Sequence, residues 1–341
     1  MCQSIKNVFD KNLTFIKLLE AHERARKGKN YKKEVIRFEI DLESNLINII
    51  KEIKSGKYKF GKYKEFIIYE PKKRLIKALP YKDRVVHQWY VEEFIKPFYC
   101  KRFIKDSYAC LENKGNHKAI LAMQKYMNDM YKKNKDYYVL KFDIKKYFYS
   151  IDKNILFNIL KRNIKDKKLL EFTKIILDDG SKKGIPIGNY TSQYFANIYL
   201  NLLDQYIKNE LRIKYYIRYM DDFVLLVNNK EQAKVLLNKI KEFLLKKLHL
   251  ELNSKCRFYH NKYGINFCGY IIFNDYILLR KRFKIKFKKN IKLWNKLYLQ
   301  NKLDKKKLLL SYNSFLAHAK HANSYNFLKK NKLKIKINIA N

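Results

Sequence analysis

The sequence predicts a protein of the α+β class. Segments with apolar residues at helical spacing and short aromatic or β-branched runs follow one another without a regular strand-helix-strand rhythm, which disfavours a doubly wound sheet. The chain also lacks GxGxxG and GxxxxGK[ST] loops, so the common nucleotide-binding folds lose support. Its 341 residues, 47% of them hydrophobic, are enough for one large domain or two to three small ones.

The charge of the chain is strongly positive. Lys and Arg number 76 against 32 Asp and Glu, which gives a formal net charge of +44. A charge of this size is self-repelling and favours a polyanionic partner, most simply nucleic acid. The sequence shows no apolar span of 18 residues and no signal-like N-terminus, so we expect no membrane association.

The cysteine and histidine patterns do not predict a zinc module. The five cysteines are odd in number, scattered and without CxxC spacing, which is typical of a reduced intracellular protein. His318 and His321 lie three residues apart in a segment with helical spacing. A structural role for this pair is favoured, with metal binding as the alternative.

The first 100 residues predict helices followed by a small hairpin. Residues 1–60 carry apolar positions at helical spacing, residues 64–69 form a short strand, and Pro71 opens a turn. The basic cluster at residues 72–76 then enters an apolar strand. A helix is expected over residues 80–95, with Pro97 ending it.

The remaining chain alternates helices with strands. We expect a strand over residues 137–142 that ends at Asp143, and a final hairpin over residues 267–273. Helices are predicted at residues 118–131, at 152–162 with Asp152 as N-cap, at 191–211, at 231–248 and in the Lys-rich segments from 280 onward.

Two adjacent carboxylates, Asp221 and Asp222, separate an aromatic-rich run at residues 215–219 from an apolar run at residues 223–227. The pattern predicts two buried strands joined by a tight hairpin. Two like charges held there are costly unless a cation compensates them, and a metal ion is the usual solution. The alternative is a hairpin tip with two solvated aspartates.

Asp143 is the second part of this candidate site, because it ends a strand 78 residues before Asp221. Two metal ions bridged by carboxylates stabilise both the attacking hydroxyl and the leaving pyrophosphate of a nucleotidyl transfer. Mg²⁺ suits such a site because it prefers oxygen ligands and leaves positions for substrate phosphates.

Six blocks, in the order found in the family, resemble the motifs of reverse transcriptases, and the similarity covers roughly residues 35–275. They are the fingers motifs from Lys73-Arg74-Leu75 to Asp83-Arg84, motif A from Phe142-Asp143 to Asp152, motif B from Gly184 to Gln193, motif C at Tyr219-Met220-Asp221-Asp222, motif D at Leu252-Asn253-Ser254-Lys255, and motif E at Phe267-Cys268-Gly269-Tyr270. The resemblance implies a right-hand polymerase fold with RNA-directed DNA polymerase activity.

The resemblance also implies the metal ligands. Asp143 and Asp221 would be the principal ligands, with Asp222 beside them and the carbonyl of Ile144 as a further ligand. Two Mg²⁺ ions are the implied cofactors, with Mn²⁺ as a substitute.

Other positions are implied to bind the dNTP and the primer. Arg74 would contact the triphosphate, Phe148 falls at the position where an aromatic ring excludes a ribose 2′-hydroxyl, and Lys255 would assist at the leaving pyrophosphate. The alternatives are a surface arginine, a core aromatic residue and a surface lysine. The implied nucleotide site also includes Ile187, Gly188 and Gln193, and the implied primer grip comprises Phe267, Cys268, Gly269 and Tyr270.

Motif B resembles that of diversity-generating retroelements, because Ser192-Gln193 stands where most retroviral, intron and retron enzymes have Ser-Pro. The block from His318 to Ala322 is also similar to theirs. Ile187 replaces a glutamine that contacts the nascent pair in retroviral enzymes. The loss of that hydrogen-bonding side chain suggests low fidelity, and simple packing of Ile187 is the alternative. The resemblance to diversity-generating retroelements implies that the errors occur at template adenines.

The resemblance predicts four regions and a set of partners. The regions are a helical extension at residues 1–60, fingers and the start of the palm at 61–142, the palm at 143–275, and a basic helical thumb at 276–341. Within the thumb, residues 281–307 would grip a duplex backbone, and binding should weaken with salt. The expected partners are an RNA template, a DNA or RNA primer, dNTPs and a small basic accessory protein. The expected location is the cytoplasm, for a bacterial or phage-encoded protein.

Three other functions remain open from the sequence. They are a reverse transcriptase devoted to phage defence, a catalytically inactive polymerase fold that only binds RNA, and a template-independent terminal transferase. The presence of Asp143, Asp221 and Asp222 together argues against the inactive fold.

Overall fold

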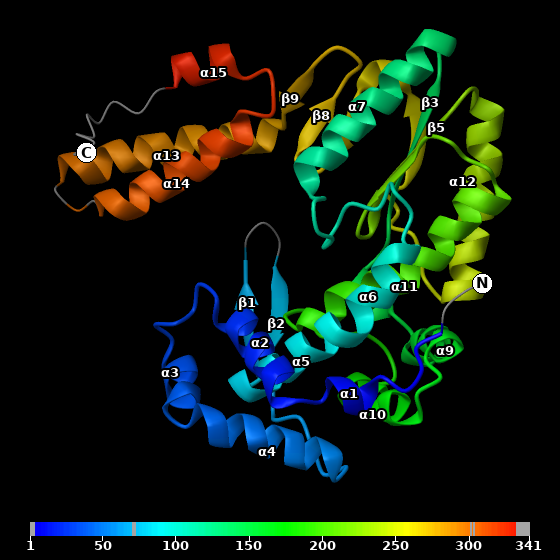
Figure 1. The fold of residues 1–341 in the computed structure, drawn as a ribbon. Coiled ribbons are helices and arrows are strands. Elements are labelled where there is room, and N and C mark those ends of the chain that lie inside the picture. The colour runs from blue at the N-terminus through cyan, green and yellow to red at the C-terminus, as the bar shows by residue number, and fades with distance from the viewer. Residues whose placement is uncertain (1–3, 70–72, 301, 303, 332–341) are drawn as a thin grey trace. The chain divides into compact units, whose positions relative to one another are not determined.

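The computed structural model describes residues 4–69, 73–300, 302 and 304–331 (Figure 1). Helices and antiparallel strands are both present, which confirms the predicted α+β class. The predicted turn at Pro71 and the adjoining Lys72 lie outside the described residues.

The chain divides into two compact units, each made of three separate segments. The first unit comprises Met1–Leu111, Asp143–Lys214 and Asn238–Lys255, and the second comprises Glu112–Phe142, Tyr215–Leu237 and Cys256–Asn341. The chain passes between the units within individual elements, since strand β3 (Tyr138–Asp143) ends one residue into the first unit and helix α12 (Lys230–Leu248) begins in the second and ends in the first.

The first unit is mainly helical. Its helices before the first boundary are α1 (Phe9–Asn12), α2 (Phe15–Arg26), α3 (Lys33–Ile40), α4 (Leu42–Lys54), α5 (Tyr81–Tyr90), the π-helix η1 (Val91–Ile95), α6 (Lys96–Tyr99) and the 3-10 turn η2 (Cys100–Arg102). Those after it are α8 (Tyr147–Ser150), α9 (Lys153–Asn163), α10 (Lys167–Leu177), α11 (Tyr190–Gln205) and the π-helix η3 (Tyr206–Glu210). Strands β1 (Lys64–Ile68) and β2 (Arg74–Ala78) form an antiparallel hairpin.

Aromatic packing and side-chain caps stabilise this unit. Phe9, Trp89, Phe94 and Phe172 form a buried cluster whose ring centroids lie 5.1–5.8 Å apart. The predicted cap of α9 is confirmed, because the Asp152 carboxylate accepts hydrogen bonds from the backbone N–H groups of the first turn.

Pro97 does not end the helix that starts near residue 80, so that prediction is wrong. The chain continues from α5 through the π-helix η1 into α6, and Pro97 occupies the first turn of α6. A proline is tolerated there because the first N–H groups of a helix have no partner within it.

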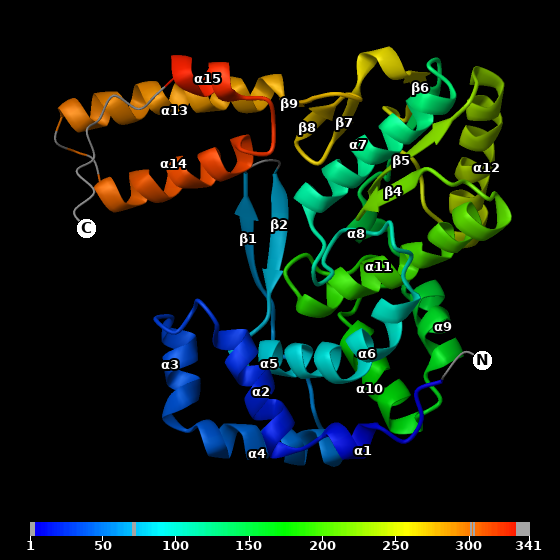
Figure 2. The same ribbon diagram turned by 45° about the horizontal axis from the view of Figure 1, so that its top comes forward.

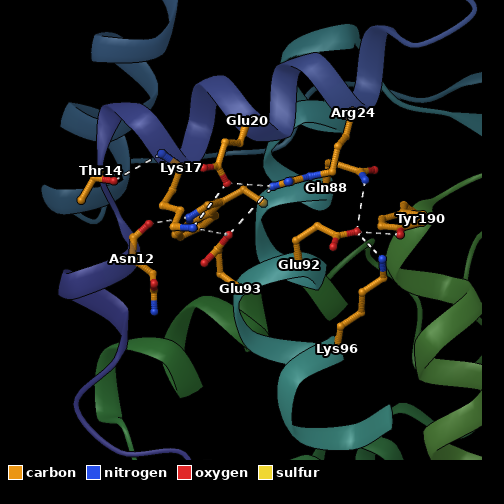
Figure 3. A network of polar contacts seen from close by, with 11 residues as sticks. Asn12, Thr14, Lys17, Glu20, Arg24, Gln88, Glu92, Glu93, Lys96 and Tyr190 are labelled. Carbon is orange, nitrogen blue, oxygen red and sulfur yellow. Dashed lines mark hydrogen bonds and ion pairs between the residues drawn. The ribbon is translucent and has the colours of Figure 1, made fainter. Parts of the chain in front are cut away.

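A network of charged side chains joins α2 to α5 and η1 (Figure 3). Lys17 and Arg24 of α2 both pair with Glu93, at 3.6 and 3.9 Å. The neighbouring Glu92 accepts hydrogen bonds from Gln88 at 3.4 Å and from the Tyr190 hydroxyl at 2.9 Å. The N-terminal helix α2 and the start of α11 are therefore both tied to the α5–η1 segment.

The second unit contains two antiparallel sheets. One has four strands in the order β4-β5-β3-β6, with β4 (Tyr216–Tyr219), β5 (Asp222–Val227) and β6 (Arg257–His260), and the other has the order β7-β8-β9, with β7 (Ile265–Phe267), β8 (Tyr270–Ile272) and β9 (Ile277–Leu279). Its helices are α7 (Asn116–Lys133), α13 (Lys281–Leu299), α14 (Lys305–Ala319) and α15 (Tyr325–Lys330), with the short 3-10 turn η4 (Asn261–Tyr263). Strands β6 and β9 are additional to the elements predicted from sequence.

Apolar contacts account for the packing within this unit. Apolar residues of α7, including Met123 and Met127, are buried, and the helix packs on strands β4 and β8. Helices α13 and α14 lie side by side in both views (Figures 1 and 2), and the rings of Phe287 and Phe315 stack between them at 3.5 Å. No helix among the described residues is long and apolar enough to cross a membrane.

Candidate active site

The predicted hairpin around the two aspartates is present in the second unit. Tyr219 pairs with Asp222, so Met220 and Asp221 form the two-residue turn between β4 and β5. The sequence pattern predicted that both aspartates lie between the strands. In the structure only Asp221 lies in the turn, and Asp222 is the first residue of β5. Met220 has a positive φ of 58°, a conformation that costs energy for a side chain of this kind.

A buried arginine supports this turn. Arg218 is fully buried in β4, and its Nη1 donates to the backbone carbonyl of Met220 at 3.1 Å. A buried guanidinium is expensive unless it is hydrogen-bonded, so the arrangement indicates that Arg218 maintains the turn and its unusual backbone.

Two contacts place the end of β3 beside the start of β5. The rings of Phe142 and Phe223 stack at 4.7 Å, and Lys141 Nζ donates to Asp222 Oδ1 at 2.6 Å. Asp143 is bonded directly to Phe142 and ends β3, and β3 and β5 are neighbours in the sheet. The sheet therefore has carboxylates at the end of one strand and at the start of the next.

Cationic side chains surround Asp222. Burial lowers the pKa of Arg280, and the negative charge of Asp222 partly offsets that effect. Burial also raises the pKa of the Cys268 thiol, and Asp222 raises it further. Lys141 lies over the Phe267 ring at 5.5 Å. Of the predicted motif E residues, Cys268 is thus an electrostatic neighbour of Asp222, and Phe267 lies against Lys141, the lysine that pairs with Asp222.

Asp143 has a different environment in the first unit. Its carboxylate accepts a hydrogen bond from Asn253 Nδ2 at 3.1 Å, and its backbone carbonyl accepts one from Asn253 N at 2.8 Å. An isolated antiparallel bridge between Ile144 and Leu252 continues this pairing. The predicted motif D segment is therefore hydrogen-bonded to the residues that follow β3.

The donors at these positions are all oxygen atoms, which suits a hard divalent cation. Among the described residues, no group of three or more His, Cys, Asp or Glu side chains is arranged to hold a metal ion. Asp143 and Asp222 instead contact Asn253 and Lys141. The donor chemistry fits a metal ion, while the ion's presence remains a prediction.

The residues expected at the nucleotide site are held in the first unit by backbone contacts. Phe148 is half-buried on α8, and its carbonyl accepts a hydrogen bond from Ile185 N at 2.8 Å. The carbonyl of Ile187 accepts one from Lys77 N of β2 at 2.9 Å. Gly188 has φ 132°, and a Cβ there would meet Lys77 O at 2.5 Å, so only glycine fits this approach.

Three other residues predicted to act on the nucleotide lie on the surface of the first unit. Arg74, Gln193 and Lys255 are all exposed. The backbone N–H of Lys255 donates to Asn253 Oδ1 at 3.3 Å, and Asn253 in turn donates to the Asp143 carboxylate. Roles for these three residues remain predictions.

The predicted primer grip forms the turn between β7 and β8. Phe267 pairs with Tyr270, and Cys268 and Gly269 have positive φ values of 47° and 95°, as a two-residue hairpin with right-handed strand twist requires. The Tyr270 hydroxyl donates to the His318 carbonyl at 2.9 Å, and the two rings stack at 4.4 Å. This hairpin is therefore attached to the end of α14.

His318 and His321 belong to a cluster of three histidines. The His117 ring, from the start of α7, stacks on His321 at 3.6 Å and lies 6.3 Å from His318. Burial, with the neighbouring positive groups, lowers the pKa of His318 to about 4. These ring contacts support the favoured structural role, in which the histidines pack α7, the end of α14 and β8 together.

Sequence reasoning did not identify Lys141, Arg218 and Arg280 as site residues. The sequence does contain a local sign of the role of Arg218, because this charged residue interrupts an otherwise aromatic and aliphatic strand just before the acidic turn. Arg280 lies 58 residues after Asp222 in sequence, so only the fold relates the two.

Comparison with protein families places this geometry in context. The family model described as "Reverse transcriptase (RNA-dependent DNA polymerase)" matches residues 62–272, which include the hairpin of Asp221, the end of β3 and the motif E turn.

Similar proteins include the "Putative COX1/OXI3 intron 2 protein" of Saccharomyces cerevisiae, at 24% identity over 38% of this chain and 23% of the yeast protein. Similar structures include apo telomerase of Candida tropicalis, at TM-score 0.49 and 15% identity over 68% of this chain and 51% of that one. A telomerase of Candida albicans in complex with a TWJ fragment of telomeric RNA has TM-score 0.47 and 12% identity, over 74% of this chain and 55% of that one. The chain spans about a quarter of the length of the yeast protein and about half of each of these telomerase chains.

Proposed function

The chain belongs to the reverse transcriptase family, and on that premise we propose that it is an RNA-directed DNA polymerase that joins dNTPs to a primer along an RNA template. The observation that carries this proposal is the pairing of Asp222 with Lys141 at the junction of β5 and β3, where Asp143 ends the strand. The net charge of +44 supports a nucleic-acid partner.

Reverse transcriptases generally use divalent metal ions, and the oxygen donors here fit such ions. Asp143, Asp221 and Asp222, with the Ile144 carbonyl, are the residues that would hold them, and two Mg²⁺ ions with Mn²⁺ as a substitute are the proposed cofactors. Bound metal would supply charge stabilisation for the attacking hydroxyl and the leaving pyrophosphate.

The chain's own residues would orient the substrates. Phe148 would exclude a ribose 2′-hydroxyl, and the hydrogen bond that its backbone carbonyl accepts from Ile185 N fixes the backbone from which the ring projects. The exposed Arg74 would bind the triphosphate as a cationic donor, and the exposed Lys255 would assist at the leaving pyrophosphate. Ile187, Gly188 and Gln193 would form the remaining wall of the nucleotide site.

The motif E turn would position the primer terminus. Its attachment to α14 through Tyr270 and His318 connects it to the Lys-rich helices that would bind the duplex backbone. The assignment of residues 1–60, 61–142, 143–275 and 276–341 to an extension, fingers, palm and thumb remains part of this proposal.

Primer extension tests the proposed activity. The full chain is incubated with an RNA template, an annealed DNA primer, Mg²⁺ and all four dNTPs, alongside Asp221→Asn and the matched surface variant Asp275→Asn. We expect extension by the native chain and by Asp275→Asn, and none by Asp221→Asn. Asp275 is an exposed aspartate of the same unit, so it controls for the loss of one negative charge.

Extension that does not depend on Asp221 would contradict the proposal. Extension of a primer with no template would instead indicate a terminal transferase, and RNA binding without Asp221-dependent synthesis would indicate an inactive RNA-binding fold.

At a finer level, we propose an error-prone enzyme of a diversity-generating retroelement, working with a small basic accessory protein. The sequence of motif B and the apolar side chain of Ile187 support this, and a phage-defence reverse transcriptase is the alternative. Sequencing of the products distinguishes them: errors concentrated at template adenines, reduced in Ile187→Gln, are expected. Accurate copying by the native chain would favour the alternative.

A further inference from the structure

A largely buried ion pair in the first unit lies outside the six motifs of the sequence. Lys153, the first residue of α9, is 7% exposed, and its Nζ contacts both Asp179 Oδ1 and Ser181 Oγ, the latter at 3.0 Å. Ser181 also donates from its backbone N and its Oγ to Asp179, at 3.0 and 2.6 Å. Burial raises the pKa of Asp179, but the hydrogen bonds from Lys153 and Ser181 outweigh this and lower it below its ordinary value.

This triad orients the loop that precedes motif B. Ser181 Oγ lies 3.0 Å from the Lys183 carbonyl, and Lys183 forms an isolated bridge with Asp152. Gly184 N then donates to Ile151 O at 2.7 Å, and Ile185 N donates to Phe148 O at 2.8 Å. The chain therefore makes a continuous set of contacts from Lys153 to the backbone of Phe148.

The loop before motif B has little conformational freedom at Gly184, where it meets the helix that carries Phe148. Gly184 has φ 85°, and a Cβ there would lie 3.1 Å from Tyr149 O, so its backbone already touches the helix that carries Phe148. A buried lysine at a helix start is also uncommon, since positive charge is unfavourable near that end of the helix. Asp179 compensates for this cost and at the same time fixes the loop.

We propose that Lys153, Asp179 and Ser181 are positioning residues that set the discrimination between deoxyribose and ribose by holding the backbone of Phe148 against residues 183–185. The inference rests on the proposed polymerase activity. Because substrate selection by a rigid aromatic side chain depends on its backbone position, loosening the loop admits the larger sugar.

The test compares the ratio of kcat/KM for a dNTP to kcat/KM for the matching rNTP in single-nucleotide extension. Asp179→Asn and Lys153→Met are expected to lower this ratio by about tenfold, whereas Lys153→Arg, which keeps the cation, should restore most of it. Lys168→Met is the matched control, because Lys168 pairs with Asp10 on the surface of the same unit, with both side chains more than 60% exposed.

Thermal unfolding identifies variants that fail to fold, and Ser181→Ala, which leaves the ion pair, serves as the mild variant. An unchanged ratio in folded Asp179→Asn and Ser181→Ala would overturn the inference. Phe148→Ala separates the two proposals: if it admits rNTPs while the triad variants do not, the polymerase proposal stands and the positioning inference falls. A native chain without Asp221-dependent synthesis overturns both.

Discussion

The two units hold their candidate catalytic carboxylates by different means. In the first unit, Asp143 contacts the neutral amide of Asn253, and the residues after it are paired backbone to backbone with Leu252. In the second unit, Asp222 contacts the cation of Lys141 and lies in the electrostatic field of Arg280. One carboxylate is thus oriented by hydrogen bonding and the other is compensated by charge.

This difference has a physical consequence. A neutral donor orients a carboxylate without cancelling its charge, so that charge stays available for a cation. A lysine at 2.6 Å cancels much of the charge and would have to move if a metal ion took its place. The contact with Lys141 therefore predicts that Asp222 contributes less to metal binding than Asp143 does, because the lysine has to be displaced first.

The largest expected effect tests this ranking. Asp143→Asn should reduce kcat/KM for dNTP incorporation by on the order of 10³-fold, and Asp222→Asn by about 10-fold to 100-fold, since the loss of one group that stabilises transition-state charge commonly costs about 10²–10³. Single-nucleotide extension measures both. Equal losses of kcat/KM in the two variants would show that the contacts with Asn253 and Lys141 do not determine how much each aspartate contributes.

The next effect concerns the support of the turn. Arg218→Leu removes the buried donor to the Met220 carbonyl and should lower the free energy of unfolding by about 3 kcal/mol. Denaturant unfolding measures the change, and Arg212→Leu, which removes an exposed arginine of the first unit, is the control. A loss below about 1 kcal/mol would mean that the turn does not need this guanidinium.

A pH effect compares one histidine in each unit, buried His87 and partly exposed His318. Burial lowers the pKa of His87 to about 3, and burial with nearby positive groups lowers that of His318 to about 4. Both groups have depressed pKa values in the folded state, so their contribution to stability is complete above the unfolded value near 6.5 and is lost as the pH falls towards 4 and 3. Lowering the pH from 8 to 5 should therefore reduce the free energy of unfolding by about 2 kcal/mol through buried His87, and by less through His318, which is partly exposed to solvent.

Denaturant unfolding between pH 8 and 5 measures this slope. His87→Gln and His318→Gln should each flatten it, and His260→Gln in the second unit serves as the control. If the slope of His87→Gln equals that of the native chain, burial of neutral His87 beside Thr191 does not govern the acid response.

The smallest expected effect separates charge from orientation. Lys141→Met should lower the free energy of unfolding by less than about 1 kcal/mol at low salt and by less still in 1 M salt, because the pair is partly exposed and screened. Asn253→Ala should lower the free energy of unfolding by about 1 kcal/mol at both salt concentrations, because the Asn253 amide that donates to Asp143 carries no charge. If the effects of Lys141→Met and Asn253→Ala depended equally on salt, the two aspartates would not differ in being held by charge and by a neutral hydrogen bond.

Local sequence patterns were sufficient for most elements. The hairpin of β4 and β5, the cap at Asp152 and the end of β3 at Asp143 follow from apolar runs and capping residues that lie close together in the chain. The helix prediction failed at Pro97, because the adjoining π-helix accommodates a residue without an N–H and the sequence gives no local sign of it. Strand β6 was not predicted, since its Arg-Phe-Tyr-His sequence forms a strand through pairing with β3.

The sequence by itself determined the class of protein, the order of the motifs and the carboxylates proposed for catalysis, because these depend on residue type and on spacing along the chain. Only the tertiary structure decided what each carboxylate contacts. Lys141, Arg280 and Asn253 lie 81, 58 and 110 residues from their aspartates, so their roles depend on strand pairing and side-chain packing. The same holds for Lys153 and Asp179, which are ordinary residues in the sequence and become a buried ion pair only where the loop before motif B folds against α9.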